Sequence, residues 1–178
     1  MATKFLKMFF AALVLSMLQS CPIGEEVCDD MGSSAYIGDL ITITPLKSTY
    51  AQGEEVIYKL NVPSENNYFG NSLNLYQKTG VTNAWYIASS TFLFEGNTVA
   101  YLKGSKRDGA DNWHNVTYNP SNGLYELQIK VKLNKTGNYS LYADDRVDFL
   151  GEDNCNKNFI YTNIQGKNAN NSIEFTVQ

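Results

Sequence analysis

The stretch YELQIKVKL, residues Tyr125–Leu133, decides the fold class of this 178-residue chain. Its five apolar side chains alternate with four polar ones, so that an apolar residue stands at every second position. Successive side chains of a β-strand point to opposite faces, and this period therefore predicts a strand with one buried and one solvated face. The turn sequence Asn119–Gly123 joins the strand to Val116–Tyr118, which predicts a hairpin.

The same two-residue period recurs along the rest of the chain. It is clearest in Ile41–Thr44, Val56–Val62 and Ile173–Val177. Phe92–Phe94 and Thr98–Leu102 lie on either side of Glu95-Gly96-Asn97, and this arrangement predicts a second hairpin. No segment after residue 20 shows the apolar period of an amphipathic helix of useful length, so we expect an all-β domain.

The segment Lys135-Thr136-Gly137-Asn138-Tyr139-Ser140-Leu141 resembles the tyrosine corner of immunoglobulin-like β-sandwiches. The resemblance implies a single antiparallel immunoglobulin-like β-sandwich over residues 39–178, with Tyr139 at the start of strand F. Leu141 would take the place of the second intersheet cysteine, and Tyr58 or Leu60 the place of its partner on strand B. Since the chain has no intersheet cysteine pair, the resemblance is to the broad sandwich architecture and to no particular family.

A long connection, residues 144–170, departs from a minimal sandwich, and connections of this length usually have a function or a structure of their own. Its first part contains the acidic residues Asp144, Asp145, Asp148, Glu152 and Asp153. They could coordinate calcium, but their spacing does not match an EF-hand loop, and a solvated acidic loop is the preferred interpretation. We expect a short hairpin around Phe159–Ile164, with Cys155 tying it to the N-terminal segment.

The N-terminus has the layout of an export signal. Lys4 and Lys7 precede an apolar run from Met8 to Leu18, which is too short to span a membrane. The ending Leu18-Gln19-Ser20-Cys21 resembles the lipobox of bacterial lipoproteins. The resemblance implies that residues 1–20 are a signal peptide and that Cys21 carries the lipid, whereas an ordinary cleaved signal would release a soluble secreted protein.

Residues 21–38 are predicted to form a flexible acidic tether, because they are rich in Gly, Ser and acidic residues and lack apolar periodicity. Acidic residues after the lipidated cysteine also resemble surface-export signals of some lipoproteins, although acidic linkers are common because they stay solvated. If Cys21 carries lipid, Cys28 and Cys155 remain as a pair. Exported chains meet oxidising conditions, so we predict that these two cysteines form a disulfide.

Nothing in the sequence supports an active site or a metal site. The net charge of −4 disfavours nucleic acid as a partner, since phosphate binding needs a basic face. The single histidine, His114, is expected to be an ordinary surface residue of the loop Lys103–Asn115. The chain has no Gly-x-Ser-x-Gly motif, and lipid attachment and the predicted disulfide would leave no free thiol to act as a nucleophile. We therefore expect no catalytic residue, no metal ligand set and no cofactor.

Three aromatic residues are the candidates for ligand binding. Trp113 is expected to be an exposed anchor, Tyr118 stands beside a turn, and Trp85 either contributes to the ligand site or packs in the core between the sheets. Flat rings with a polar edge suit stacking on sugars and anchoring at protein interfaces.

These features predict a cell-envelope lipoprotein of the outer membrane, facing either the surface or the periplasm. Its partners would be the membrane, through the lipid anchor, and a glycan or protein ligand. The leading hypothesis is a non-enzymatic binding or adhesion module. The alternative is an accessory or structural subunit of an outer-membrane transport or export complex, and a hydrolase is a third alternative that no motif supports.

Overall fold

The computed structural model describes residues 32–89, 92–142, 144–153 and 156–178. The predicted signal peptide, Cys21, Cys28 and Cys155 lie outside these residues. Within the described part of the chain, no helix is both long enough and apolar enough to cross a bilayer.

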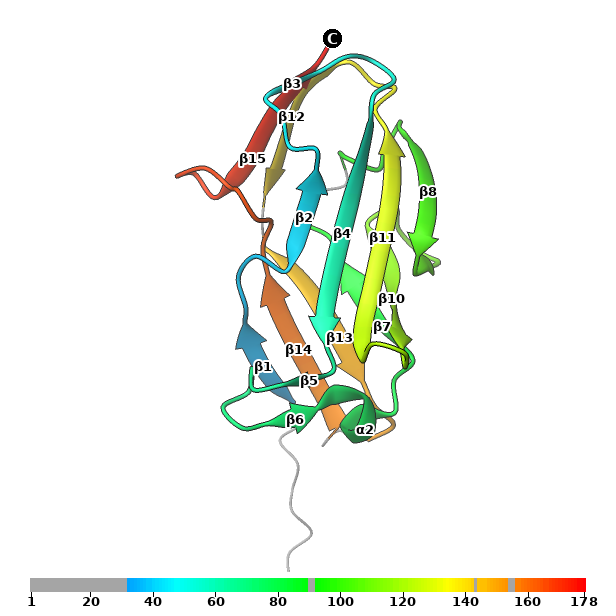
Figure 1. Ribbon diagram of the computed structural model, residues 1–178, viewed down its shortest axis with the longest axis vertical. Helices are drawn as coiled ribbons and strands as arrows, with labels where there is room; N and C mark the ends of the chain where they lie inside the picture. Colours follow the sequence, from blue (N-terminus) through cyan, green and yellow to red (C-terminus); the bar gives the residue numbers. More distant parts are fainter. Residues whose placement is uncertain (1–31, 90–91, 143, 154–155) are drawn as a thin grey trace, which may run out of the picture.

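Most strands belong to one large sheet (Figure 1). Its order is β1 (Ser33–Tyr36), β14 (Lys157–Thr162), β13 (Asp145–Leu150), β7 (Asn83–Ile87), β10 (Trp113–Asn119), β11 (Leu124–Lys132), β4 (Glu55–Pro63) and β2 (Ile41–Thr44). Two further strands pair with it laterally, β8 (Thr98–Lys103) with β11 and β9 (Ser105–Lys106) with β10.

The large sheet curls until its two ends meet. Ile41 in β2 forms a parallel bridge with Ile164, which follows β14. The N–H of Ile41 donates to the carbonyl of Asn163 at 3.3 Å, and the N–H of Gln165 donates to the carbonyl of Ile41 at 2.8 Å. The protein is therefore all-β, built on a strongly curled sheet.

The sheets are mixed, so the prediction of a purely antiparallel domain is wrong. β1 runs parallel to β14, and β3 (Thr49–Tyr50) runs parallel to β15 (Ser172–Val177). β1 also lies inside the segment that was predicted to be a flexible tether. Its four residues are too short and too polar to show a period, but they pair along their whole length with β14.

A second, small sheet has the order β12 (Gly137–Tyr142), β15, β3 and lies near the C-terminal end of the domain (Figure 1). Its inward side chains join those of the large sheet in one apolar core. Tyr139 is buried at the start of β12, and its hydroxyl donates to the carbonyl oxygen of Lys135 at 2.8 Å. The backbone hydrogen bond expected of a tyrosine corner is thus present.

The opposite end of the domain carries α2 (Leu75–Thr79) and the short pair β5 (Glu65–Asn66) and β6 (Leu73–Asn74) (Figure 1). The helix was not expected, because five residues cannot show an amphipathic period. The residues that specify this helix lie at its two ends. The side chain of Asn74 accepts from the N–H of Gln77 at 3.0 Å, and Gly80 ends the helix in the left-handed conformation.

The segment Tyr125–Leu133 behaves as predicted. It supplies nearly all of β11, its apolar side chains are buried, and it pairs with β10 as a hairpin through Thr117 and Glu126. The hairpin predicted for Phe92–Leu102 is wrong. Residues 92–97 form turns, and Leu93 and Phe94 are buried in the core. β8 pairs with β11 instead, because Leu93 and Phe94 gain more by filling the core than by edge pairing.

The long connection between β12 and β15 contains β13 and β14, which pair as a hairpin. A hairpin was predicted there, but its first strand is the acidic segment that was interpreted as a solvated loop. Asp145 and Asp148 are buried in β13 because each has polar partners on its own face of the sheet. No group of acidic residues, His and Cys within the described residues could hold a metal ion.

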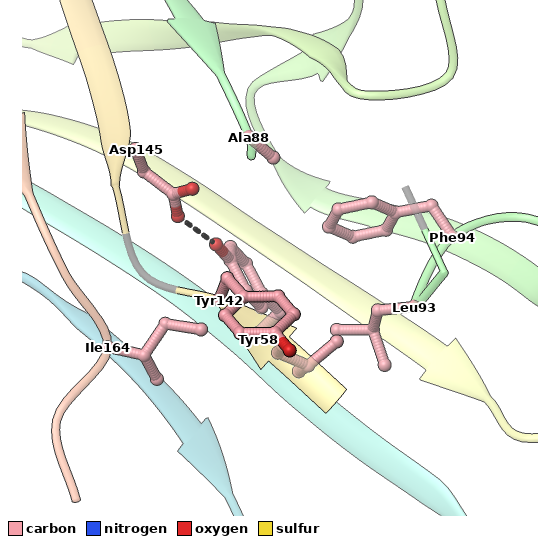
Figure 2. Close-up of a pocket in the computed structure, with 8 residues that line it drawn as sticks. Tyr58, Ala88, Leu93, Phe94, Tyr142, Asp145 and Ile164 are labelled. Carbon is pink, nitrogen blue, oxygen red and sulfur yellow. Dashed lines mark hydrogen bonds between the residues drawn. The ribbon is translucent and has the colours of Figure 1, made fainter. Parts of the chain in front are cut away.

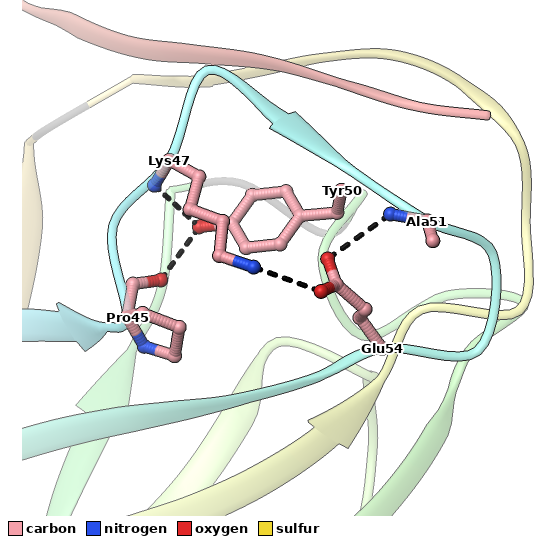
Figure 3. A network of polar contacts seen from close by, with 5 residues as sticks. All are labelled: Pro45, Lys47, Tyr50, Ala51 and Glu54. Atoms are coloured by element: carbon pink, nitrogen blue, oxygen red, sulfur yellow. Dashed lines mark hydrogen bonds and ion pairs between the residues drawn. The ribbon is translucent and has the colours of Figure 1, made fainter.

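The link from β2 to β4 is closed by a polar network (Figure 3). The hydroxyl of Tyr50 donates to the carbonyl of Pro45 at 2.7 Å and accepts from the N–H of Lys47 at 2.9 Å. Lys47 forms an ion pair with Glu54 at 2.8 Å, and Glu54 also accepts from the N–H of Ala51 at 3.0 Å. The turn at this corner is therefore held by side chains as well as by backbone.

Candidate functional site

His114 lies in β10 and is buried, so its assignment to a surface loop is wrong. The strand starts at Trp113, and the alternation of faces turns His114 into the core. Its Nδ1 is hydrogen-bonded to the hydroxyl of Tyr101 at 2.7 Å, and its ring stacks on Tyr86. Burial lowers the pKa of His114 to about 4, and the imidazole is neutral at neutral pH.

A second buried polar group, Asp145, lies nearby in the core. Its Oδ2 accepts from the hydroxyls of Tyr86 at 2.6 Å and Tyr58 at 3.1 Å, and its Oδ1 accepts from the N–H of Ser89 at 2.6 Å. The Tyr58 and Tyr86 hydroxyl oxygens also lie within hydrogen-bonding distance of each other, so two hydroxyl protons are shared among three contacts. Burial raises the pKa of the Asp145 carboxyl and of both tyrosines.

This interior cluster has groups that could move protons, but it has no room for a substrate. The cavity bounded by Tyr58, Leu141 and Asp145 (Figure 2) has about 10 Å³ of space for the centre of a water-sized sphere. That is room for roughly one water molecule. The Asp145 part of this cluster is hydrogen-bonded within the core, whereas the buried Nε2 of His114 has no hydrogen-bond partner among the described residues.

Two of the three predicted ligand-binding residues meet on the outer face of the large sheet, the face turned away from the core. Trp85 in β7 and Trp113 in β10 lie edge to face, with ring centroids 5.0 Å apart. Their neighbours Ala84, Tyr86 and His114 are buried, which shows that both indoles point outward. Packing of Trp85 between the sheets, which was the preferred interpretation for this residue, is thus wrong.

Both indoles are already partly covered. The guanidinium of Arg107 lies 4.5 Å from the ring centroid of Trp85, and its Nη1 donates to Oδ1 of Asn115 at 3.2 Å. The backbone at Gly109 lies so close to Trp113 that a Cβ there would clash with Cζ3 and Cε3 of the indole. Trp113 is half-buried and is not the exposed anchor that was expected.

Tyr118, the third predicted ligand-binding residue, lies apart from the tryptophans. Its ring stacks on Tyr76 of α2 at 4.2 Å between centroids, and it contacts the buried Tyr125 at 5.1 Å. It helps to fix α2 against the end of the sheet.

The structure adds a groove that was not predicted, at a point where the large sheet branches. β11 pairs with β10 at residues 124–126 and with β8 at residues 128–132, while β10 pairs with β9 at residues 114–115. Gly104 links β8 to β9 in this fork with φ +75°. A Cβ there would clash with the carbonyl oxygen of Asn115 and lie 2.8 Å from Cδ1 of Leu127.

The groove has a volume of about 300 Å³, within the range of small-ligand pockets. It is lined by Lys103, Gly104, Thr117, Tyr118, Asn119, Pro120 and Glu126. Figure 1 shows β8 beside β11, on the side away from β4. Thr117 and Glu126 alternate with the core residues Val116, Tyr125 and Leu127, so the groove that they line opens on the outer face of β10 and β11.

A buried carboxylate holds the polar part of the groove together. Glu126 is only 5% exposed; its Oε1 accepts from Nζ of Lys103 at 2.6 Å, and its Oε2 accepts from Nδ2 of Asn119 at 2.9 Å. Burial alone would raise the pKa of this carboxyl, but the hydrogen bonds from Lys103 and Asn119 bring it below its usual value. Glu126 is therefore a charged acceptor at neutral pH.

Sequence reasoning missed this site because alternation assigned Glu126 simply to the polar face of its strand. Lys103 was placed at the edge of a loop, far from Glu126 along the chain. The signal that could have helped is Gly104, a glycine between two strand-like segments, which often marks close backbone approach.

Further along the outer face, one row of side chains crosses five strands. Register aligns Trp113 with Ile87, Ile87 with Arg146, Arg146 with Tyr161 and Tyr161 with Tyr36. Tyr36 is 58% exposed and Tyr161 41% exposed. This end of the face is aromatic and accessible, beside the edge strand β1.

No protein-family model matches this chain, and the searches of curated proteins and of solved structures also found no match.

Proposed function

We propose that the protein is a lipid-anchored protein of the cell envelope whose β domain binds a ligand and catalyses no reaction. The binding surface is the outer face of β10 and the groove beside it. The observation that carries this proposal is the Lys103–Glu126–Asn119 cluster, which lines a ligand-sized groove. Such a concave site with a few convergent polar groups is the usual form of a small-ligand site.

The outward side chains of β10 extend this surface toward the tryptophans. Asn115 donates to Oγ of Ser105 at 3.0 Å, and the hydroxyl of Thr117 donates to Oδ1 of Asn83 at 2.8 Å. Trp113, Asn115, Thr117 and Asn119 thus give β10 a continuous outer row of ring, amide, hydroxyl and amide. A row that ends in the groove supports binding of an extended ligand.

A binding role fits this groove better than hydrolysis. Glu126 is the only carboxylate among the residues that line it, and its lowered pKa keeps it ionised at neutral pH. Hydrolysis of a glycosidic bond uses a pair of carboxyl groups, one of which must be protonated.

The immunoglobulin-like architecture belongs to the same proposal. The hydrogen bond from Tyr139 to Lys135 supports it. Leu141 of the small sheet and Tyr58 of the large sheet also line the same interior cavity, which supports their positions as the intersheet pair.

The test is the binding of the full-length protein to immobilised neutral glycans, anionic glycans and purified envelope proteins, measured by biolayer interferometry. The double variant Lys103→Met/Glu126→Gln is compared with Glu55→Gln/Lys130→Met. The latter removes a solvent-exposed ion pair, 3.4 Å long, between β4 and β11. We expect at least one probe to bind wild type and the control but not the groove variant. Binding to no probe, or equal binding by both variants, contradicts the proposal.

The second candidate is an accessory subunit of an envelope complex, favoured by the edge strand β1. Among the described residues β1 pairs with β14 alone, so one of its sides is an open sheet edge, and the exposed rings of Tyr36 and Tyr161 lie beside it. Such an edge can accept a further strand from another protein. A photocrosslinker at position 36 should give an adduct with an envelope protein in cells; recovery of uncrosslinked monomer alone would exclude this role.

A further inference from the structure

We infer that the groove binds a neutral oligosaccharide, with Glu126, Lys103 and Asn119 as the groups that contact sugar hydroxyls. The inference rests on the proposed binding function and names the ligand class of the same site. It is carried by the charge balance of the groove, by its supply of donors and acceptors and by the length of the outer row of β10.

The charges of the groove cancel. Lys103 is the only cation among the lining residues, and it is paired with Glu126, the only anion, at 2.6 Å. A phosphate, sulfate or uronic acid would bring a second anion close to Glu126, and no free cation of the lining would neutralise it. A neutral ligand meets no such penalty.

The donors and acceptors match a pair of neighbouring hydroxyl groups. Lys103 is 43% exposed at its side chain and uses one of the three N–H donors of its ammonium on Glu126. The carboxylate of Glu126 lines the groove, and although it is largely buried and already accepts from Lys103 and Asn119, its remaining lone pairs can accept from an O–H group. Each sugar hydroxyl both donates and accepts, so a diol can bind across the ion pair without leaving a buried group unsatisfied.

The rest of the lining suits the C–H surface of a sugar ring. Pro120 supplies apolar atoms, and Gly104 contributes backbone to the lining. A ligand that were entirely polar would gain nothing from Pro120.

The length of the site points to an oligosaccharide. Thr117 and Trp113 are four residues apart in β10, which corresponds to about 13 Å along a strand. This is longer than one sugar ring, and the path between them passes Asn115 and the neighbouring Arg107. Further sugar units can therefore contact the amide and the edge of the indole cluster.

The experiment is isothermal titration calorimetry of the full-length protein with cellohexaose, laminarihexaose, maltohexaose and mannohexaose. Glucose, mannose and hexagalacturonate are the comparison ligands. We expect one or more neutral hexaoses to bind, more tightly than the monosaccharides, and the hexagalacturonate not to bind. Glu126→Gln and Lys103→Met should each weaken binding about tenfold or more, because each removes a charged hydrogen-bond partner. Lys130→Met is the matched control and should leave affinity unchanged.

The outcomes separate the inference from the proposed function. One outcome is that the hexagalacturonate or an envelope protein binds, that Glu126→Gln abolishes this binding, and that no neutral hexaose binds. This outcome overturns the inference and leaves the proposed function in place. Failure of every probe overturns both. Equal loss of affinity in Lys130→Met would assign the effect to general surface charge and would also overturn the inference. The thermal midpoint of each variant is measured first, and Asn119→Ala provides a third groove variant if one of the others is destabilised.

Discussion

At the scale of single residues, the core contains ionisable groups whose burial makes stability depend on pH. His114 in the folded protein has a pKa of about 4 against an ordinary value of 6.5. Between these values the unfolded chain binds a proton at this residue and the folded chain does not. Stability must therefore fall as the pH drops through this window.

We expect proton binding to His114 in the unfolded chain to lower the free energy of unfolding by about 3 kcal/mol between pH 7 and pH 4. The measurement is the free energy of unfolding in urea at several pH values, for wild type and for His114→Phe. The phenylalanine ring can keep the stacking on Tyr86, and its unfolding free energy should depend less on pH. The pKa of Asp145 is raised in the folded state, so its protonation makes stability rise as the pH falls. Both proteins contain Asp145, and the difference between their pH dependences therefore reports on His114 alone. Equal slopes would contradict this prediction.

The carboxylate of Asp145 satisfies three donors, and its removal should be severe. Asp145→Ala removes the acceptor of the Ser89 N–H and leaves the Tyr58 and Tyr86 hydroxyls only each other as partners, which should cost about 3 kcal/mol or more. Asp145→Asn should cost less, because its amide oxygen can still accept from Ser89. The adjacent Asp144→Ala, at an exposed position, should stay within about 0.5 kcal/mol of wild type. Chemical denaturation of the four proteins checks the order.

At the scale of elements, prediction succeeded where a segment carries its own period. β11 and β15 could be predicted because one face of each is apolar and the other polar or partly exposed over several residues. β1 and β13 could not. β1 consists of Ser-Ser-Ala-Tyr, and β13 contains the buried Asp145, whose partners come from other segments, and the buried Asp148, which is paired with Arg146 of β13 itself. Non-local pairing decides such strands, and a single sequence does not display it.

In the candidate site, too, the local features could be predicted from the sequence and the non-local contacts could not. The aromatic character of Trp85 and Trp113 is visible in the sequence, whereas their coverage by Arg107 and Gly109 depends on how a loop folds back. The groove depends on a branch of the sheet, which no local pattern encodes.

The branch itself can be tested at Gly104. Gly104→Ala should destabilise the protein by about 2 kcal/mol or more, because it adds a clash to an unfavourable positive φ. Gly123→Ala is the matched control: it has φ 68° but no atom within 4 Å of the added Cβ, so it should cost only about 1 kcal/mol. Denaturant midpoints give both values. If Gly123→Ala lost more stability than Gly104→Ala, the fork would be shown to tolerate a side chain.

At the scale of the whole molecule, the start of the described chain lies against the β13–β14 hairpin. Gly32 is so close to β14 that a Cβ would lie 2.7 Å from the carbonyl oxygen of Lys157. Ser33 pairs in parallel with Asn158, and the predicted disulfide partners Cys28 and Cys155 each precede these strands by a few residues. Both cysteines lie outside the described residues, and the bridge between them stays a prediction.

Peptide mapping of the non-reduced protein by mass spectrometry should recover Cys28 and Cys155 in one linked pair. The bridge would close a long loop, and Cys28→Ser/Cys155→Ser should lower stability by about 2–4 kcal/mol under oxidising conditions. Under reducing conditions the two proteins should have equal stability. Two alkylated free thiols in the oxidised protein would refute the bridge.

The parallel pairing of β1 with β14 also has a mechanical consequence. If Cys21 holds the chain to a membrane while the outer face holds a ligand, and the predicted Cys28–Cys155 bridge is reduced, tension reaches the domain at Ser33 and loads β1. The hydrogen bonds between β1 and β14 lie across the axis of β1, so a pull along that axis loads them together in shear and does not peel them apart one at a time. Beyond them, the bridge between Ile41 and Ile164 meets the same force next. In a domain tethered in this way, the edge strand β1 would carry the load through its pairing with β14.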